Sequence, residues 1–447
     1  MSKGFNRERA GRWLAWSCAM AFLCYGVCSS LAEDISADTG KLRWMGHWKG
    51  EGGREQMVRE VLDEFRFLHP KLDVEFQFAS DVLPEKSQLS AANCIVEMIR
   101  SGTFDWDVVW LDPLIYSMVA DQLDDWDWGR KHLVDFCAVP GFGKTQKNFL
   151  VEGKDAHRYT AGVFPGPYIE GFLYTAWYNQ SVADRLGLDI REEGMTEKDL
   201  LGYVEKVHAY NQTAAEPIAA FLDVARSGSF RRLYYGLLYS CLPECDSEGE
   251  ADGPTIAEAY ARTDAFFGEL GRYQPTEGNA ASVTWPDAAR FMLVENRALF
   301  FFDATWRYNA FKTACPERIG QLRLAQMPGF GGNSHAVGGY LTTWAVLKNA
   351  PGRDAGIELM RHWSRPPIAQ KWVRYTKCPT GLKGDLYDPT FGQDIHAEFQ
   401  RRLRLKCNNL MADPPVFSSR FVEQYPSIDP ERAAVAVLKL RGDEGGE

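Results

Sequence analysis

The sequence predicts an α/β fold in which helices cover a mainly parallel sheet. Residues 41–45 and 71–78 have the composition of strands, and between them apolar side chains recur at helical spacing over 54–68. A strand–helix–strand unit of this length implies two parallel strands. The unbroken apolar run Ala298–Phe302 supports the same class, because strands buried on both faces carry such runs.

The same pattern continues along the chain. The run Val108–Trp110 predicts another strand between two helices, and Thr196 with Asp199 has the spacing of a helix-capping box. Thr284 is the expected cap of a later helix that has Pro286 in its first turn. We expect strands at 172–179 and 338–348, and helices at 91–102, 113–122, 197–208, 282–296, 352–363 and 366–375.

The N-terminal segment has the pattern of a secretory signal. Four basic residues precede an apolar run, and Ser30 and Ala32 stand at the −3 and −1 positions of a cleavage site. We therefore expect residues 1–32 to be a signal peptide that directs the protein to the periplasm. An uncleaved anchor remains an alternative, since residues 13–32 are long enough to span a bilayer.

Charge and cysteine content narrow the range of partners. The net charge of −10 argues against nucleic acid, which requires basic patches. Seven cysteines lie beyond residue 32, and Cys241 and Cys245 form the nearest pair. An exported protein can form disulfides, but an odd number leaves at least one thiol.

Motifs for cofactors and catalysis are missing from the sequence. The glycine-rich turn Gly50–Gly53 matches no phosphate-binding pattern, and the histidines and cysteines lack zinc spacing. Asp105 and Asp107 offer two carboxylates, but their position at the start of a strand favours a structural role. No Gly-x-Ser-x-Gly motif is present. We expect no cofactor, no metal and no catalytic residue.

Aromatic and acidic residues follow the carboxyl ends of several predicted strands. Trp48 follows the first strand, Asp112 follows the strand at 108–110, and Asp303 and Trp306 follow the run at 298–302. Ligands of open α/β sheets bind at that edge. Indole rings suit the C–H faces of sugars, and carboxylates accept hydrogen bonds from hydroxyl groups. The pattern therefore predicts a carbohydrate site with Trp48 as a platform.

At this point the order of motifs resembles a known family. From residue 40 to about residue 380 the chain is similar to the extracellular solute-binding proteins of bacterial ABC importers, in the sugar-binding group that includes maltose-binding protein. The motifs that carry the resemblance are EFRFLHPKLDVEFQF, DWDVVWLDP, LYTAWYNQSVADRLGL, MTEKDLLGYVEKV, RALFFFDATWRYN, GGYLTTWAVLKNAPGRDAGIELMRHW and TKCPTG.

The resemblance implies a two-lobed periplasmic-binding-protein fold of the type II kind. The N-terminal lobe would comprise 40–169 and 328–375, and the C-terminal lobe 170–327 and 376–447. Crossings between them would lie near 168–174, 324–329 and 372–379. The lobes would close on a sugar like a hinge. The monomeric protein would then deliver the ligand to the permease subunits and ATPase of an ABC transporter.

The resemblance also implies a set of ligand contacts. Trp306 matches the stacking tryptophan of the family, although the preceding turn, Asp303–Thr305, lacks the usual glycine. Gly338, Gly339 and Tyr340 match a segment whose backbone approaches the ligand, and Phe230 is a weaker candidate. The expected ligand-binding residues are Trp48, Asp112, Tyr168, Glu170, Phe230, Asp303, Trp306, Gly339 and Tyr340.

Two other functions remain open from the sequence. One is an exported carbohydrate-active enzyme that uses Asp112, Glu170 or Asp303 as acid and base. The other is a solute-binding protein that serves a membrane sensor, or one that takes a non-sugar ligand such as a polyamine or a metal complex.

Overall fold

The computed structural model describes most of the chain between residues 40 and 378. The described residues are 40–85, 87–142, 162–167, 170–224, 229–241, 253–276, 283, 285–332, 338–376 and 378, with 432, 435, 436 and 440. The predicted signal peptide 1–32, the predicted cap Thr284 and Cys245 lie outside them. Among the described residues, no helix is both long enough and apolar enough to span a membrane.

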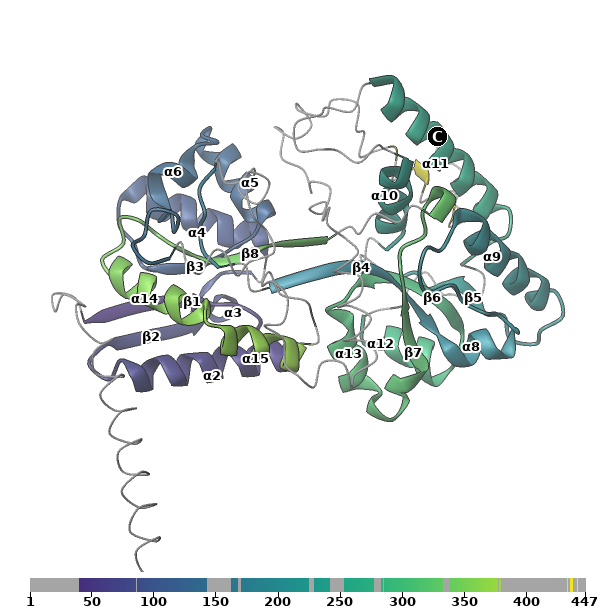
Figure 1. Ribbon diagram of the computed structural model, residues 1–447, viewed down its shortest axis with the longest axis horizontal. Coiled ribbons are helices and arrows are strands. Elements are labelled where there is room, and N and C mark those ends of the chain that lie inside the picture. Colours follow the sequence, from purple (N-terminus) through teal and green to yellow (C-terminus); the bar gives the residue numbers. More distant parts are fainter. Residues whose placement is uncertain are drawn as a thin grey trace, which may run out of the picture.

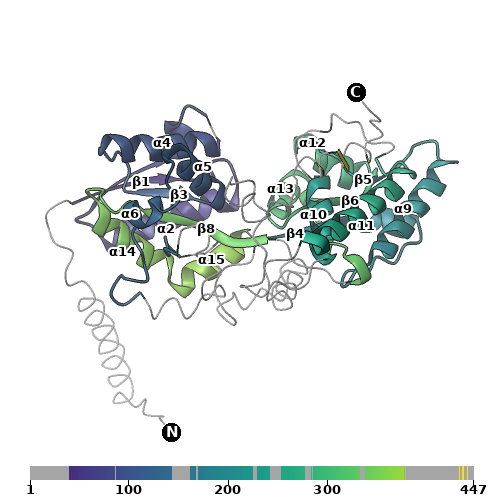
Figure 2. The same cartoon turned by 90° about the horizontal axis from the view of Figure 1, so that it is seen from above.

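Two lobes stand side by side, joined by two strands, β4 and β8 (Figures 1 and 2). The first lobe is built from the N-terminal part of the chain and from a later return. Its elements are β1 (Lys41–Gly46), α2 (Gly53–Leu68), β2 (Asp73–Phe78), α3 (Ala79–Val82), α4 (Gln88–Ser101), β3 (Val108–Leu111), α5 (Pro113–Leu123), α6 (Trp128–His132), β8 (Gly338–Val346), α14 (Arg353–Trp363) and α15 (Pro366–Thr376).

The second lobe is formed by the intervening part of the chain. Its elements are β4 (Glu170–Asn179), α8 (Gln180–Arg185), α9 (Glu197–Asn211), β5 (Ala219–Phe221), α10 (Ser229–Cys241), α11 (Gly253–Gly271), α12 (Trp285–Ala289), the π-helical turn η2 (Arg290–Val294), β6 (Ala298–Ala304), α13 (Arg307–Ala314), the 3-10 turn η3 (Pro316–Gln321), β7 (Leu322–Ala325) and the 3-10 turn η4 (Phe330–Gly332).

The sheet is mixed, and its path runs from one lobe into the other. The strand order is β2-β1-β3-β8-β4-β6-β5, and β7 also pairs with β4. β1 is parallel to β2 and β3, and β5 is parallel to β6. β8 is antiparallel to both β3 and β4, and β4 is antiparallel to β6 and β7. The α/β class is therefore confirmed, with fewer parallel pairs than the sequence predicts.

Separate hydrophobic cores underlie the two lobes. The first core takes buried residues from 42–164 and from 344–378. In the second lobe, Phe300 and Phe302 pack on one face of β6 and Phe301 on the other, as the alternation of a strand requires. The lobe boundaries expected from the sequence stay predictions. Cys378 packs in the first core, although the predicted boundary places it in the C-terminal lobe.

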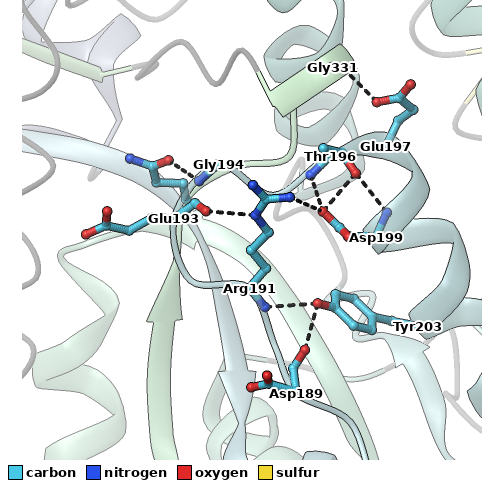
Figure 3. Close-up of polar contacts among 10 residues, drawn as sticks. Asp189, Arg191, Glu193, Gly194, Thr196, Glu197, Asp199, Tyr203 and Gly331 are labelled. Atoms are coloured by element: carbon cyan, nitrogen blue, oxygen red, sulfur yellow. Dashed lines mark hydrogen bonds and ion pairs between the residues drawn. The ribbon is translucent and has the colours of Figure 1, made fainter.

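Local signals in the sequence explain several helix starts. Thr196 and Asp199 form the predicted capping box at the start of α9: the Thr196 hydroxyl accepts from Asp199 N at 3.0 Å, and the Asp199 carboxylate accepts from Thr196 N at 2.9 Å. Figure 3 shows how Arg191 and Tyr203 then fasten the preceding loop to this helix. In the first turn of the same helix, Glu197 accepts from the N–H of Gly331 at 2.8 Å (Figure 3).

The role of Asp107 is structural, as its position predicts. Its side chain has no exposed surface, and the carboxylate accepts from the Arg43 backbone N–H at 2.7 Å and from the Arg43 guanidinium at 2.9 Å. The backbone N–H of Gly352 donates at 2.9 Å to Oδ1, the same oxygen that accepts from the Arg43 guanidinium. Asp107 therefore ties β1 to the start of α14.

His362 in α14 makes the stability of the first lobe depend on pH. The imidazole is buried, and burial together with the Arg365 guanidinium lowers its pKa from the ordinary 6.5 to about 4, although Glu64 opposes the shift. The neighbouring His69 and Lys371 also disfavour the protonated form. The native state therefore holds this imidazole neutral over a pH range in which the unfolded chain protonates it.

We expect the free energy of unfolding to fall as the pH drops from 6.5 to 4. His362 contributes its full stabilisation above pH 6.5, and the loss at pH 4 amounts to about 2–3 kcal/mol. Urea unfolding at a series of pH values, compared with the His362→Gln variant, measures this term. Parallel pH profiles for the two proteins would contradict the assignment.

Candidate functional site

The loop after β1 leads into α2 through three positions of positive φ and one tightly packed glycine. Trp48, Gly50 and Gly52 have φ values of 71°, 80° and 57°. A Cβ on Gly53 would collide with the backbone carbonyl of Tyr375 in α15. The backbone N–H of Gly50 donates to Glu55 at 2.6 Å, and this hydrogen bond is the main cause of the lowered pKa of Glu55. The glycines therefore serve the turn and the contact between α2 and α15.

The ring of Trp48 packs inside the first lobe. It is 4% exposed, and its centroid lies 4.5 Å from Trp110, 5.3 Å from Trp372 and 5.4 Å from Trp344. The left-handed backbone conformation of Trp48 changes the direction of the chain shortly after the end of β1. A ligand platform needs an accessible face, and this ring is covered by other indoles. Contact between Trp48 and a ligand stays a prediction.

Arg54 lies among indole rings from both lobes. Its guanidinium carbon is 5.7 Å from the ring centroids of Trp48 and Trp372 and 6.0 Å from that of Trp306. The side chain is 11% exposed, and its Nη1 donates to Glu51 at 3.2 Å. These distances are within the range of cation–π attraction.

Trp306 connects the two lobes. It follows β6 at the start of α13, is half-buried, and packs against the cores of both lobes. Tyr174 meets it edge-on at 6.0 Å, because the pairing of β4 with β6 sets Tyr174 opposite Ala304. We call Trp48, Arg54, Tyr174, Trp306 and Trp372 the interlobe junction.

Asp303, next to this junction, is neutralised by two arginines. The carboxylate has no exposed surface and accepts from Arg232 Nη1 at 2.6 Å and from Arg307 Nε at 2.7 Å. Arg232 also lies over the Tyr174 ring, with its guanidinium carbon 4.8 Å from the centroid. Asp303 therefore positions two arginine side chains beside the junction, and its contact with a ligand stays a prediction.

Asp112 caps a helix in the first lobe. One carboxylate oxygen accepts from the backbone N–H of Ile115 at 2.8 Å, and the other accepts from Gln88 at 2.6 Å. Burial raises the pKa of Asp112, while these hydrogen bonds oppose the shift.

Phe230 is also buried, at 1% exposure, in the second core against Phe221. Contact of Asp112 or Phe230 with a ligand remains a prediction.

Comparison with solved structures identifies the architecture. The maltose-bound MalE3 of T. maritima aligns with a TM-score of 0.62 and 16% identity over 90% of this chain and 98% of that one. The sugar-binding protein MalE of the phytopathogen Xanthomonas citri aligns with a TM-score of 0.61 and 15% identity, covering 91% and 93%. The GacH receptor of Streptomyces glaucescens, described unliganded and with acarbose, gives 0.61 and 13%, covering 91% and 100%. This chain has the two-lobed solute-binding fold.

At these identities the likeness concerns the fold. No protein-family model and no curated protein matches the sequence. Of the proteins aligned here, one is described as a receptor, one as a sugar-binding protein and one with maltose bound. In the described part of this chain, no group of His, Cys, Asp and Glu side chains could hold a metal ion.

Other predicted site residues belong to the strands that join the lobes of the solute-binding fold. Glu170 is the first residue of β4, and Gly339 and Tyr340 lie in β8. Phe172 pairs with Gly339, and the register shifts between Glu170 and Phe172. Tyr168 lies outside the described residues. The backbones of these predicted contacts therefore meet at the connection between the lobes.

Some residues that the sequence reasoning missed belong to the junction or lie beside it. Arg54, Tyr174, Arg232 and Trp372 come from α2, β4, α10 and α15. A basic residue in the first turn of a helix, directly after a Trp–Gly loop, was the one local signal for Arg54. Arg232 is 71 residues away from Asp303 in the sequence, and no local pattern joins them.

Proposed function

We propose that this protein is an exported carbohydrate-binding protein that delivers its ligand to an ABC importer through closure of its two lobes. The observation that carries the proposal is the interlobe junction, where Trp306 of the second lobe meets Arg54 and the first core. A sugar ring stacked on a half-buried indole at this position would contact both lobes at once. Closure would then follow because a saccharide in contact with both lobes links them more tightly than their own side chains do without it.

The fold comparisons support this class of ligand. MalE3 is described with maltose and the GacH receptor with acarbose, and both share the fold of this chain. Export through a signal at 1–32, a periplasmic location, a monomeric state, and a partner permease with its ATPase belong to the same proposal.

An exported glycosidase is not favoured. Such an enzyme needs two carboxyl groups that reach one glycosidic bond. Asp303 is fully buried between two arginines, and Asp112 is held as a helix cap. The geometry of both carboxylates suits a structural role better than proton transfer, which supports binding without turnover.

We expect one saccharide in a panel of mono- and oligosaccharides to raise the melting temperature of the purified protein. At 100 times the dissociation constant the ligand stabilises the native state by roughly 2.7 kcal/mol. The Trp306→Ala variant should lose most of this shift, because the indole supplies the stacking surface. Differential scanning fluorimetry measures both effects.

A matched control is Tyr273→Ala, which removes another partly exposed aromatic ring of the second lobe. Tyr273 contacts His208 and Glu205 on α9, away from the junction. This variant should keep the full ligand-induced shift. The absence of a shift with every saccharide would overturn the proposed function, and an unchanged shift in Trp306→Ala would move the site elsewhere.

A further inference from the structure

Arg54 makes a contact that crosses from one lobe to the other. It belongs to the first turn of α2 in the first lobe, where Trp48 and Trp372 flank its guanidinium at 5.7 Å each. The ring of Trp306, 6.0 Å away, belongs to the second lobe. A second contact between the lobes comes from Asn309 in α13, whose Nδ2 donates to the carbonyl of Thr376 in α15 at 2.9 Å.

The position of Arg54 is well fixed on the first lobe. Glu51 holds Nη1 at 3.2 Å, and 11% of the side chain is exposed. The guanidinium is planar and stacks on aromatic faces, as a sugar ring does. The Arg54 guanidinium thus lies over the ring of Trp306, which is the ring on which a saccharide stacks in the proposed function.

We propose that Arg54 is an affinity-determining residue. In the ligand-free protein its guanidinium lies over the indole ring of Trp306 and holds the lobes together, and a saccharide that binds to Trp306 displaces it. This inference rests on the proposed function for the identity of the competitor. A contact that exists only in the absence of ligand stabilises the ligand-free state. The apparent affinity for the ligand is reduced by the same free energy. Removing the guanidinium should therefore strengthen saccharide binding and loosen the ligand-free lobes.

The test uses Arg54→Met, which keeps an apolar stem and removes the cation, together with Arg54→Lys, which keeps the charge without the planar group. Arg59→Met is the matched control. Arg59 also lies on α2, stacks on Phe78 at 4.9 Å and pairs with Glu55, all within the first lobe. Circular dichroism and a cooperative melting curve establish that each variant is folded.

The first measurement is small-angle X-ray scattering of the ligand-free proteins. We expect a larger radius of gyration for Arg54→Met than for the wild type, an intermediate value for Arg54→Lys and no change for Arg59→Met. This measurement needs no ligand, so it decides the interlobe contact even if the proposed function fails. An unchanged radius of gyration in folded Arg54→Met would overturn the proposal.

The second measurement is calorimetric titration with the saccharide that stabilises the wild type. We expect the dissociation constant of Arg54→Met to fall by about fivefold to tenfold, in the range of ordinary coupling between sites. Weaker binding by this variant would show that Arg54 contacts the ligand, and would overturn its role as a competitor. If no saccharide binds the wild type, the proposed function fails and the scattering result still stands.

Discussion

Replacing Asp303 with alanine is expected to lower the free energy of unfolding by about 3–5 kcal/mol, the usual effect of removing one partner from a buried ion pair. The carboxylate is fully buried, and its loss leaves Arg232 and Arg307 facing each other across an empty space. The N–H of Ala304, which donates to the same carboxylate at 2.7 Å, also loses its acceptor. Urea unfolding followed by far-UV circular dichroism measures the change.

Asp81→Ala serves as the control for this experiment. Asp81 pairs with Lys49 at the surface, where both side chains are more than a third exposed, and exposed pairs contribute about 0–1 kcal/mol. If Asp303→Ala unfolded like the wild type and lost only its saccharide binding, the carboxylate would be a ligand contact and the structural account of it would be wrong.

Replacing Trp48 with alanine is expected to destabilise the protein by about 3–5 kcal/mol, as large-to-small changes of aromatic residues in cores do. The ring is 4% exposed and touches Trp110, Trp344 and Trp372, so its loss opens a cavity within the first core. The backbone strain at φ 71° remains with alanine and offers no relief. Equilibrium unfolding in urea gives the value.

The contrast with Trp306→Ala makes this result informative. Trp306 is half-buried, so its truncation should cost less stability than truncation of Trp48 and should cost most of the saccharide shift. A loss below about 1 kcal/mol for Trp48→Ala, well under the usual core value, would contradict the place of its ring in the first core.

Elements with a clear period or an unbroken apolar run, such as β6, could be predicted from the sequence, whereas a helix buried on all sides could not. The amphipathic α2 and α15 were expected within a residue or two. α10 was missed because its residues from Leu233 to Ser240 are buried on all sides, which leaves no polar face to reveal a helical period. The antiparallel pairing of β3 with β8 joins segments more than 200 residues apart, and no local pattern encodes its direction.

The candidate site shows the same division. The positions of Trp48 and Trp306 after two strand ends followed from simple strand assignment. The direction of the Trp48 ring depended on a left-handed backbone that tryptophan rarely adopts, and so it was not predictable. The state of Asp303 depended on Arg232 in a different helix. The residue types that follow the strand ends in the sequence therefore locate the junction. Which of these side chains are accessible there depends on tertiary contacts.

In the proposed function a saccharide binds at the interlobe junction and touches both lobes. Hydrogen–deuterium exchange, with and without the saccharide that most raises the melting temperature, tests it most directly. We expect the saccharide to slow exchange in the peptides that cover 47–54 of the first lobe and 303–309 of the second. Protection confined to one lobe, or located away from both segments, would contradict it.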